Sequence, residues 1–177
     1  MRTEKGGAFH GSERLTATLL MMFAERLCES LSNDGFVSEI RARKALYDRR
    51  LVILPMVNPD GCDIVGEGSI NCGGFKESVN RLSVGDFSHW NANVRGVDIN
   101  HNFDAGWNIL HTLEQKSNIY GPSPTSYGGP RPQSEPETAA LVNLCEKIDF
   151  CHVAAFHSQG EIIYWRYGNN TPTKGKR

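Results

Sequence analysis

Residues 9–31 read FHGSERLTATLLMMFAERLCESL and contain the most regular pattern in this chain of 177 residues. Apolar residues recur there at intervals of three and four: Leu15, Leu19, Met22, Phe23, Leu27 and Leu31. This interval places them in one stripe along an α-helix. We therefore predict a helix that begins just after Glu13 and ends at Asn33-Asp-Gly35.

Apolar runs further along the chain predict strands. Leu51–Val57 is continuously apolar, which is typical of a strand buried on both faces. Pro55 indicates a strand end or a bulge, because proline has no N–H to donate to a sheet. Residues 152–156 and 162–165 predict two short strands joined by Ser158-Gln-Gly160.

Between these strands the sequence predicts one long irregular region and one helix. From Gly61 to Tyr127, glycine and small polar residues are frequent and periodicity is weak, so we expect long loops. Ser134 precedes Pro136 and stands three residues before Glu137, which is a capping-box pattern. We predict a helix from there to about residue 148. Its buried face would consist of three apolar residues: Leu141, Leu144 and Ile148.

Strands separated by helices indicate an α/β fold with a mixed, mostly parallel sheet and helices on both faces. With 39% hydrophobic residues, the chain is long enough for one core, so we interpret residues 1–177 as a single domain. Ligand sites in such sheets gather at the carboxyl ends of the strands. We expect His10 and His157 at that edge.

Charge and hydropathy exclude several kinds of partner. The net charge is −1 and no sustained basic run is present, so we predict no nucleic-acid binding. No apolar stretch reaches the roughly 20 residues that span a bilayer, so we predict no membrane span. The N-terminus lacks the layout of a signal peptide, which predicts a cytoplasmic protein, or an extracytoplasmic one if the N-terminus is truncated.

Five cysteines are present, and no CxxC pair suggests a zinc ribbon. We expect reduced thiols. A bridge between Cys62 and Cys72 is the alternative if the protein is exported.

His10-Gly-Ser-Glu13 places an imidazole and a carboxylate three residues apart where a strand would lead into the first helix. Both groups bind zinc, and a catalytic zinc site needs three protein ligands and an open position. His157, at the end of an apolar strand, is the candidate for the third ligand of one Zn²⁺ ion. By itself the pair is weak, because four-residue matches arise by chance and a histidine at a strand end is more often structural.

Four further motifs follow this pair: Asn58-Pro-Asp-Gly61, Gly96-Val-Asp-Ile-Asn-His-Asn-Phe103, Ser134-Glu-Pro-Glu-Thr138 and His157-Ser-Gln-Gly160. In this order they resemble the zinc carboxypeptidases similar to carboxypeptidase A, from about Phe9 to Gly168. The resemblance implies the zinc carboxypeptidase-like (phosphorylase/hydrolase-like) fold and a metallopeptidase with His10, Glu13 and His157 as zinc ligands.

Within that family, three segments look most like the bacterial γ-D-glutamyl-meso-diaminopimelate peptidases: Asn93–Trp107, Tyr127-Gly-Gly129 and Phe156–Gly160. The implied reaction is hydrolysis of peptidoglycan-derived (murein) peptides. The partner would be a peptide from the cell wall.

The substrate site departs from the family pattern. In the family an Asn-Arg pair binds the substrate's terminal carboxylate, whereas this chain has Asn100-His101. Imidazole cannot reproduce the guanidinium fork, which argues against ordinary removal of a C-terminal residue. Asn100 has an alternative role as a turn-capping amide.

The catalytic groups depart further. Arg95 is a weak candidate for stabilising the oxyanion, and a solvated loop arginine is its alternative. The family's general-base Glu lies well after the last zinc ligand, so we expect it beyond residue 177. Glu161, in the turn after His157, is the only acid that follows this ligand. We therefore expect an incomplete domain, shortened at both ends relative to the family.

Two other functions compete with peptide hydrolysis. The first is zinc or peptide binding by an inert fragment that lacks the general base. An amidohydrolase of the aspartoacylase type would share the zinc ligands, but it does not explain Asn58-Pro-Asp-Gly61 or Ser134-Glu-Pro-Glu-Thr138.

Overall fold

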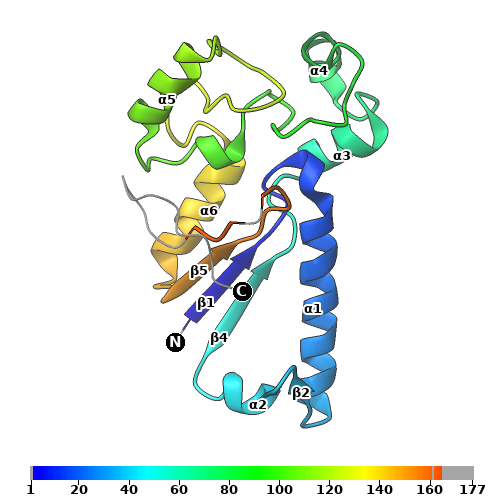
Figure 1. The fold of residues 1–177 in the computed structure, drawn as a ribbon, viewed down its shortest axis with the longest axis vertical. Coiled ribbons are helices and arrows are strands. Elements are labelled where there is room, and N and C mark those ends of the chain that lie inside the picture. The colour runs from blue at the N-terminus through cyan, green and yellow to red at the C-terminus, as the bar shows by residue number, and fades with distance from the viewer. Residues whose placement is uncertain (1, 161, 165–177) are drawn as a thin grey trace.

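Three parallel strands form the centre of the protein in a computed structural model that describes residues 2–160 and 162–164 (Figure 1). The strands are β1 (Arg2–Gly6), β4 (Arg50–Leu54) and β5 (His152–Ala155), in the order β4-β1-β5. Gly6 pairs with Leu54 on one side and with Ala155 on the other. The three carboxyl ends therefore lie level at one edge, and the predicted α/β fold with a parallel sheet is confirmed.

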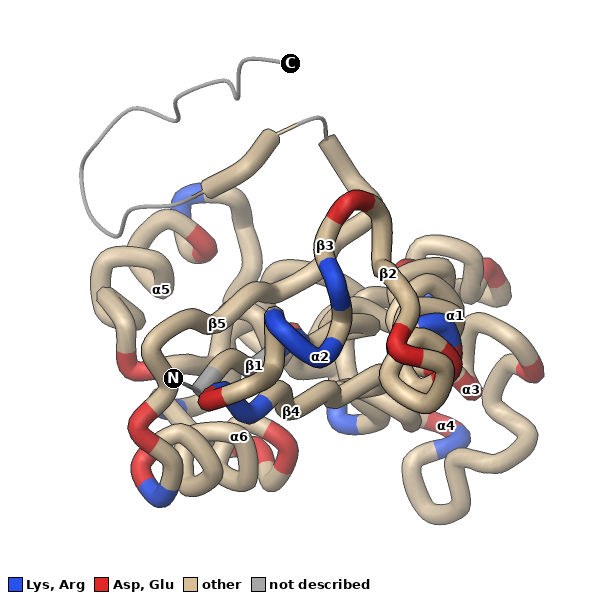
Figure 2. Tube along the Cα trace, turned by 90° about the horizontal axis from the view of Figure 1, so that it is seen from below, with Lys and Arg blue, Asp and Glu red and all other residues tan. Residues whose placement is uncertain are grey.

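The two longest helices cover opposite faces of this sheet: α1 (Arg14–Ser32) and α6 (Pro136–Lys147) (Figures 1 and 2). Neighbouring residues of β4 face opposite sides of the sheet. Leu51 lines a cavity with Phe23 of α1, whereas Val52 lines another cavity with Lys147 of α6. The chain runs from β1 through α1 to β4 on one side of β1, and later through α6 to β5 on the other side. Right-handed crossovers in opposite directions place their helices on opposite faces.

The predicted helix after Glu13 is confirmed as α1, but its apolar stripe divides between two faces. Phe23, Leu27 and Leu31 of the predicted stripe are partly buried, and Leu20, which the stripe did not include, is buried. Three other members of the stripe are more than half exposed: Leu15, Leu19 and Met22. Thr16 and Ala17 take their place on the buried side, because small side chains let the first turns of α1 approach the loop after β1.

The predicted strand at Leu51–Val57 is confirmed as β4, which ends directly before Pro55. It is only partly buried, because it is an edge of the three-stranded sheet among the described residues. The second of the two C-terminal strands is wrong: Ile162–Tyr164 lie in no strand, and Trp165 is outside the described residues. A short antiparallel pair, β2 (Phe36–Val37) and β3 (Ile40–Arg41), leads into α2 (Ala42–Ala45).

The prediction of long loops from Gly61 to Tyr127 is wrong in three places. This region contains α3 (Pro59–Glu67), α4 (Lys76–Ser83) and α5 (Trp107–Lys116), with the 3₁₀ turns η2 (Gly73–Phe75) and η3 (Ile99–His101). These helices are short, so their periodicity is weak. Of these helices, α3 and α4 contribute to a separate apolar cluster that contains Ile64, Cys72, Val79, Trp90 and Ala92.

The helix predicted from Ser134 is confirmed as α6, but not its capping box. Glu135 occupies the N-cap position and makes no side-chain cap. The Ser134 hydroxyl instead donates to the Glu135 carboxylate at 2.7 Å. Pro136 begins the helix, where its missing N–H costs nothing.

Within the described part of the chain, no helix is both long and apolar enough to cross a membrane. All five cysteines are free thiols, including Cys62 and Cys72.

Candidate metal centre

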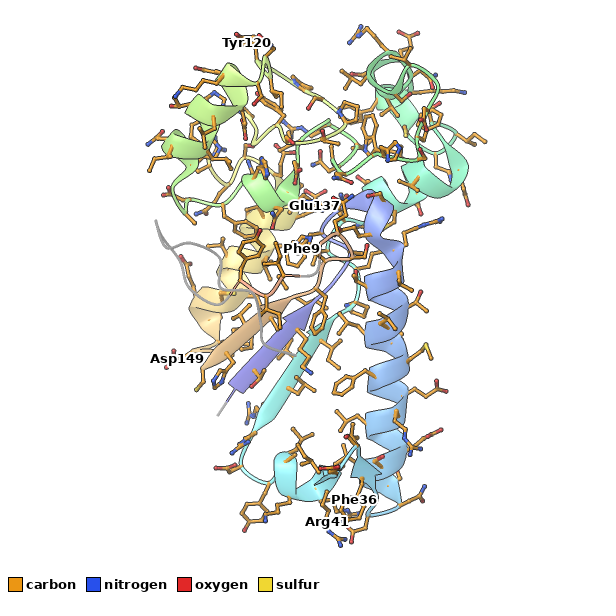
Figure 3. All side chains as sticks on the ribbon, in the orientation of Figure 1. Phe9, Phe36, Arg41, Tyr120, Glu137 and Asp149 are labelled. Carbon is orange, nitrogen blue, oxygen red and sulfur yellow. The ribbon has the colours of Figure 1, made fainter. Side chains whose placement is uncertain are left out.

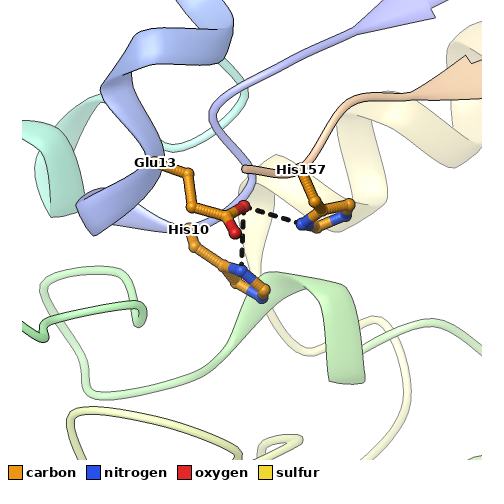
Figure 4. Close-up of side chains that lie close together, drawn as sticks. All are labelled: His10, Glu13 and His157. Atoms are coloured by element: carbon orange, nitrogen blue, oxygen red, sulfur yellow. Dashed lines mark hydrogen bonds and ion pairs between the residues drawn. The ribbon is translucent and has the colours of Figure 1, made fainter. Parts of the chain in front are cut away.

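The three predicted metal ligands meet at the carboxyl ends of β1 and β5 (Figure 4). His10 follows β1 after a short loop, and the 3₁₀ turn η1 (Gly11–Glu13) leads from it into α1. His157 stands two residues after β5. The sheet register thus brings together Glu13 and His157, which are 144 residues apart.

One oxygen of Glu13 lies between the two imidazoles. Glu13 Oε2 is 3.1 Å from Nδ1 of His10 and 2.7 Å from Nδ1 of His157. One ligand atom from each residue lies within 4.8 Å of the others. This compact set of two imidazoles and a carboxylate matches the donors that catalytic zinc sites use.

Several polar atoms of this cluster are buried without a hydrogen bond. They are the second oxygen of Glu13, Oε1, and both ring nitrogens of His10. Glu13 is only 1% exposed. Buried polar atoms are normally paired, so an unpaired Glu13 oxygen and an unpaired His10 Nδ1 beside it fit a metal ion.

Asp98 stands behind His10 and was not assigned a role from the sequence. Its Oδ1 lies 3.4 Å from His10 Nε2, so His10 presents Nδ1 to Glu13 and Nε2 to Asp98. Metal-binding histidines commonly turn their other nitrogen toward a carboxylate. The only signal for Asp98 was its place in the Gly96-Val-Asp-Ile-Asn-His-Asn-Phe103 motif.

The charges around Asp98 and His10 favour their contact. Burial disfavours the charged form of Asp98, but His10, His101 and the Ser126 N–H outweigh it and lower the pKa of its carboxyl. Burial likewise disfavours charge on His10, yet Asp98 and Glu13 prevail and raise its pKa. A cation at this position therefore finds a favourable environment.

Asn58 fixes the loop that carries His10. Its fully buried side chain donates to the carbonyl oxygens of Phe9 at 3.1 Å, Asn91 at 3.0 Å and Ala92 at 3.0 Å. Its own oxygen accepts from Gly61 N–H at 2.9 Å and caps α3. The Asn58-Pro-Asp-Gly61 motif therefore clamps the loop that carries His10.

Gly11 and Thr16 complete this clamp. A Cβ atom on Gly11 would meet the Gly61 carbonyl oxygen at 2.4 Å, so only glycine allows the approach of η1 to α3. The Thr16 hydroxyl donates to the Glu13 carbonyl at 2.8 Å and accepts from Ala8 N–H at 2.7 Å. Phe9 stacks on His157, with the ring centroids 5.5 Å apart.

The predicted substrate residues lie on η3, next to Asp98. Asn100 is exposed, and its N–H donates to Asp98 Oδ1, so Asp98 rather than the Asn100 amide caps this turn. His101 Nδ1 lies 2.9 Å from the Ser126 carbonyl and 3.1 Å from Glu114 Oε1. Substrate binding by Asn100 and His101 stays a prediction.

Arg95 has a different contact from the one predicted. Its Nε lies 3.5 Å from Oε2 of the fully buried Glu135, which also accepts from Asn93 at 2.8 Å. Its role at an oxyanion stays a prediction. Glu161 lies outside the described residues.

Comparison with known proteins agrees with this geometry. The profile of the family described as zinc carboxypeptidase matches residues 6–177. γ-D-Glutamyl-L-diamino acid endopeptidase 1 of Lysinibacillus sphaericus is 34% identical over 172 residues, which are 96% of this chain and 42% of that protein. The carboxypeptidase N catalytic chain of Rattus norvegicus is 29% identical over 91% of this chain and 32% of its own length.

A solved structure shows the same fold. The carboxypeptidase A from Helicoverpa armigera superimposes with a TM-score of 0.62 at 24% identity, over 97% of this chain and 37% of that chain. The chain thus spans less than half the length of these relatives.

Proposed function

This chain belongs to the zinc carboxypeptidase family, and on that premise we propose that it is the zinc-binding part of a peptidase for peptidoglycan-derived γ-D-glutamyl-diaminopimelate peptides. The observation that carries the proposal is the Glu13 oxygen held between His10 and His157. The donor set, its burial and the carboxylate behind His10 all suit one zinc ion.

His10, Glu13 and His157 would hold the metal in this proposal. When bound, zinc supplies Lewis-acid polarisation of a peptide carbonyl and acidification of a water molecule. Asp98 orients His10, and Asn58 keeps the loop of His10 against α3. Asn100 and His101 would contact the substrate, and Arg95 would face its scissile carbonyl.

Two observations support the choice of substrate. The relative with 34% identity is named for cleaving γ-D-glutamyl-L-diamino acid bonds. His101 replaces the family's arginine fork, which disfavours the simple C-terminal carboxylate as the main recognition element. A γ-linked peptide with a further carboxylate on its diamino acid suits a site that has His101 in place of the arginine.

Zinc and peptide binding without turnover is the second candidate function. Among the described residues, the carboxylates that contact the cluster are Glu13 and Asp98, and both are engaged by histidine. General acid–base catalysis contributes roughly 10²- to 10⁴-fold, so a chain without a free acid there would hydrolyse peptide very slowly. We therefore propose that these 177 residues alone bind peptide and cleave it poorly.

Incubation of the zinc-loaded chain with a γ-D-glutamyl-meso-diaminopimelate peptide separates the two candidates. Mass spectrometry would measure product, and calorimetry would measure binding. Binding that requires zinc, with no product, supports the second candidate. Product that a chelator abolishes supports the first, and its loss in Glu161→Gln would identify Glu161 as the base. A zinc-loaded chain that neither binds nor cleaves the peptide contradicts both.

A further inference from the structure

An apolar cavity of about 300 Å³ lies between α1, the sheet and the β2–β3 hairpin. Its large aliphatic lining residues are Leu27, Val37, Ile40, Leu46 and Leu51. Figure 3 shows Phe36 and Arg41 of the hairpin at the opposite end of the molecule from Phe9, which precedes the metal ligand His10. The cavity is therefore separate from the metal centre.

Hydrogen bonds hold the hairpin against the end of α1. The Ser30 hydroxyl donates to the Phe36 carbonyl at 3.0 Å, and Gly35 N–H donates to the Ser30 carbonyl at 2.7 Å. Arg41 forms an ion pair with Asp34 at 2.7 Å. The cavity is therefore preformed, and a ligand that enters it does not have to order these segments first.

Lys5 brings a positive charge to this apolar lining. It lies on the central strand β1, is partly buried, and lines the cavity together with Phe23. Its Nζ stands 4.2 Å from the centroid of the Phe23 ring. In the part of the chain that the structure describes, no carboxylate forms an ion pair with Lys5. An ammonium group that is partly withdrawn from water is stabilised by an anion beside it.

The charged residues of the lining all have the same sign. They are Lys5, Arg49 and Arg50, and no acidic residue lines the cavity among the described residues. Asp48, which is exposed, lies 3.6 Å from the Nε atom of Arg49. Figure 2 shows further basic residues along β3 and α2, the elements next to the cavity. The electrostatic potential at its mouth therefore favours an anion.

We propose that this cavity binds a single-chain aliphatic carboxylate, with the hydrocarbon chain against the aliphatic lining and the carboxylate beside Lys5. The two parts of the lining determine this class of ligand. A hydrocarbon chain covers the aliphatic surface, and a carboxylate forms a charge-assisted contact with an ammonium group. An inorganic anion would leave the apolar surface uncovered, and a neutral hydrocarbon would leave Lys5 without a partner. Such a site goes beyond the proposed peptidase function and requires no zinc.

A series of fatty carboxylates tests the apolar part of the site. Hexanoate, octanoate and decanoate would be titrated below their micelle concentrations into the parent chain, with and without zinc, and binding measured by calorimetry. Each added CH₂ group should tighten binding about threefold to fourfold, as burial of one methylene predicts. Equal affinities for the three ligands, or no binding of decanoate, overturn the proposal. Neither result depends on zinc, so the proposed function is tested separately.

Lys5→Met tests the charged part of the site, because it keeps an unbranched side chain and removes the ammonium group. The parent should bind octanoate more tightly than 1-octanol. In Lys5→Met this ratio of affinities should fall about threefold to fivefold, as loss of a partly exposed ion pair predicts. The exposed Lys116 of α5 provides the control, and Lys116→Met should keep the ratio. A ratio that is unchanged in Lys5→Met contradicts the role of Lys5.

Ile40→Glu decides the matter if Lys5→Met does not fold. Ile40 is 61% exposed and lines the cavity, so this change should preserve the fold while it places a negative charge at the mouth. Decanoate binding should weaken at least about tenfold, from repulsion and lost apolar contact. Ile109→Glu is the matched control, because Ile109 of α5 is 69% exposed and lies outside the cavity lining. Equal decanoate binding in the two variants overturns the site.

Two other occupants of the cavity would also overturn the proposal. A second copy of the chain would appear in sedimentation velocity as a dimer that decanoate does not dissociate and that Ile40→Glu does. A membrane surface would appear as binding to phosphatidylglycerol vesicles without binding of monomeric decanoate. We expect a chain that binds decanoate as a monomer.

Discussion

Glu13 is the residue on which the candidate metal centre depends most, because one of its oxygens contacts both histidines. Glu13 Oε1 is buried and has no hydrogen-bond partner among the described residues, which is costly for a carboxylate oxygen. A divalent ion would satisfy all three side chains. The residue types of the site thus determine its ligand.

Asp98→Asn tests the support behind His10. The amide keeps the size of the side chain but removes the charge that orients the imidazole. We expect zinc affinity to fall about 10- to 100-fold, as is usual for loss of a carboxylate behind a metal-bound histidine. Competition with a chromogenic chelator measures it. The exposed Asp104→Asn is the control, and equal affinities in the two variants would refute the role of Asp98.

Cys62 should be the least reactive of the cysteines in the native chain. It is 3% exposed, and burial, followed by the charge of Asp63, raises the pKa of its thiol to about 11. At pH 8 only about one thiol in 10³ would be thiolate, so alkylation should be at least ~10²-fold slower than at the exposed Cys28 and Cys151. Mass spectrometry after timed iodoacetamide treatment measures the rates. Equal labelling at the three positions would show that Cys62 is not buried as described.

At the scale of elements, the site depends on how α3 is joined to the loop after β1. Asn58 links the two, since its amide reaches three loop carbonyls while its oxygen caps α3. Gly11 allows the close approach. Stability of the fold and geometry of the site are therefore coupled at this junction.

Asn58→Ala should destabilise the chain by about 2–4 kcal/mol, because it removes the cap of α3 and the amide donor to the buried carbonyl groups of Phe9 and Ala92. Urea unfolding followed by circular dichroism measures this change. Asn108, exposed on α5, offers the control Asn108→Ala. A loss below about 0.5 kcal/mol, which is the size of ordinary surface effects, would contradict the clamp.

Much of the element order could be predicted from the sequence, because strong patterns coincide with long elements. The spacing after Glu13 predicted α1, and Pro55 marked the end of β4. The helices between Gly61 and Tyr127 were missed, since each is too short for a clear periodicity and is held by tertiary contacts. Leu15 and Leu19 are exposed, so the periodicity predicts the apolar stripe but not which part of it is buried.

The candidate site could also be predicted only in part. His10, Glu13 and His157 were chosen by residue type and motif, and the sheet register brings them together. Glu114, which contacts His101, was not chosen, because it lies in the region predicted as loops. This contact depends on the helix α5, which carries Glu114.

At the scale of the whole molecule, the family fold is represented by a chain that spans less than half the length of its relatives. Its described sheet has two open edges, at β4 and β5. Leu15, Leu19 and Met22 form an exposed apolar stripe on α1. The metal ligands nevertheless lie within this part of the fold, so zinc binding should be a property of the chain itself.

Zinc content of the purified chain, measured by inductively coupled plasma mass spectrometry after dialysis, tests this claim most directly. We predict one zinc ion per parent chain, because His10, Glu13 and His157 supply three converging ligands. His157→Ala should lose the stoichiometric zinc, whereas the exposed His152→Ala of β5 should retain it. Equal zinc in His157→Ala and in the parent would contradict the account.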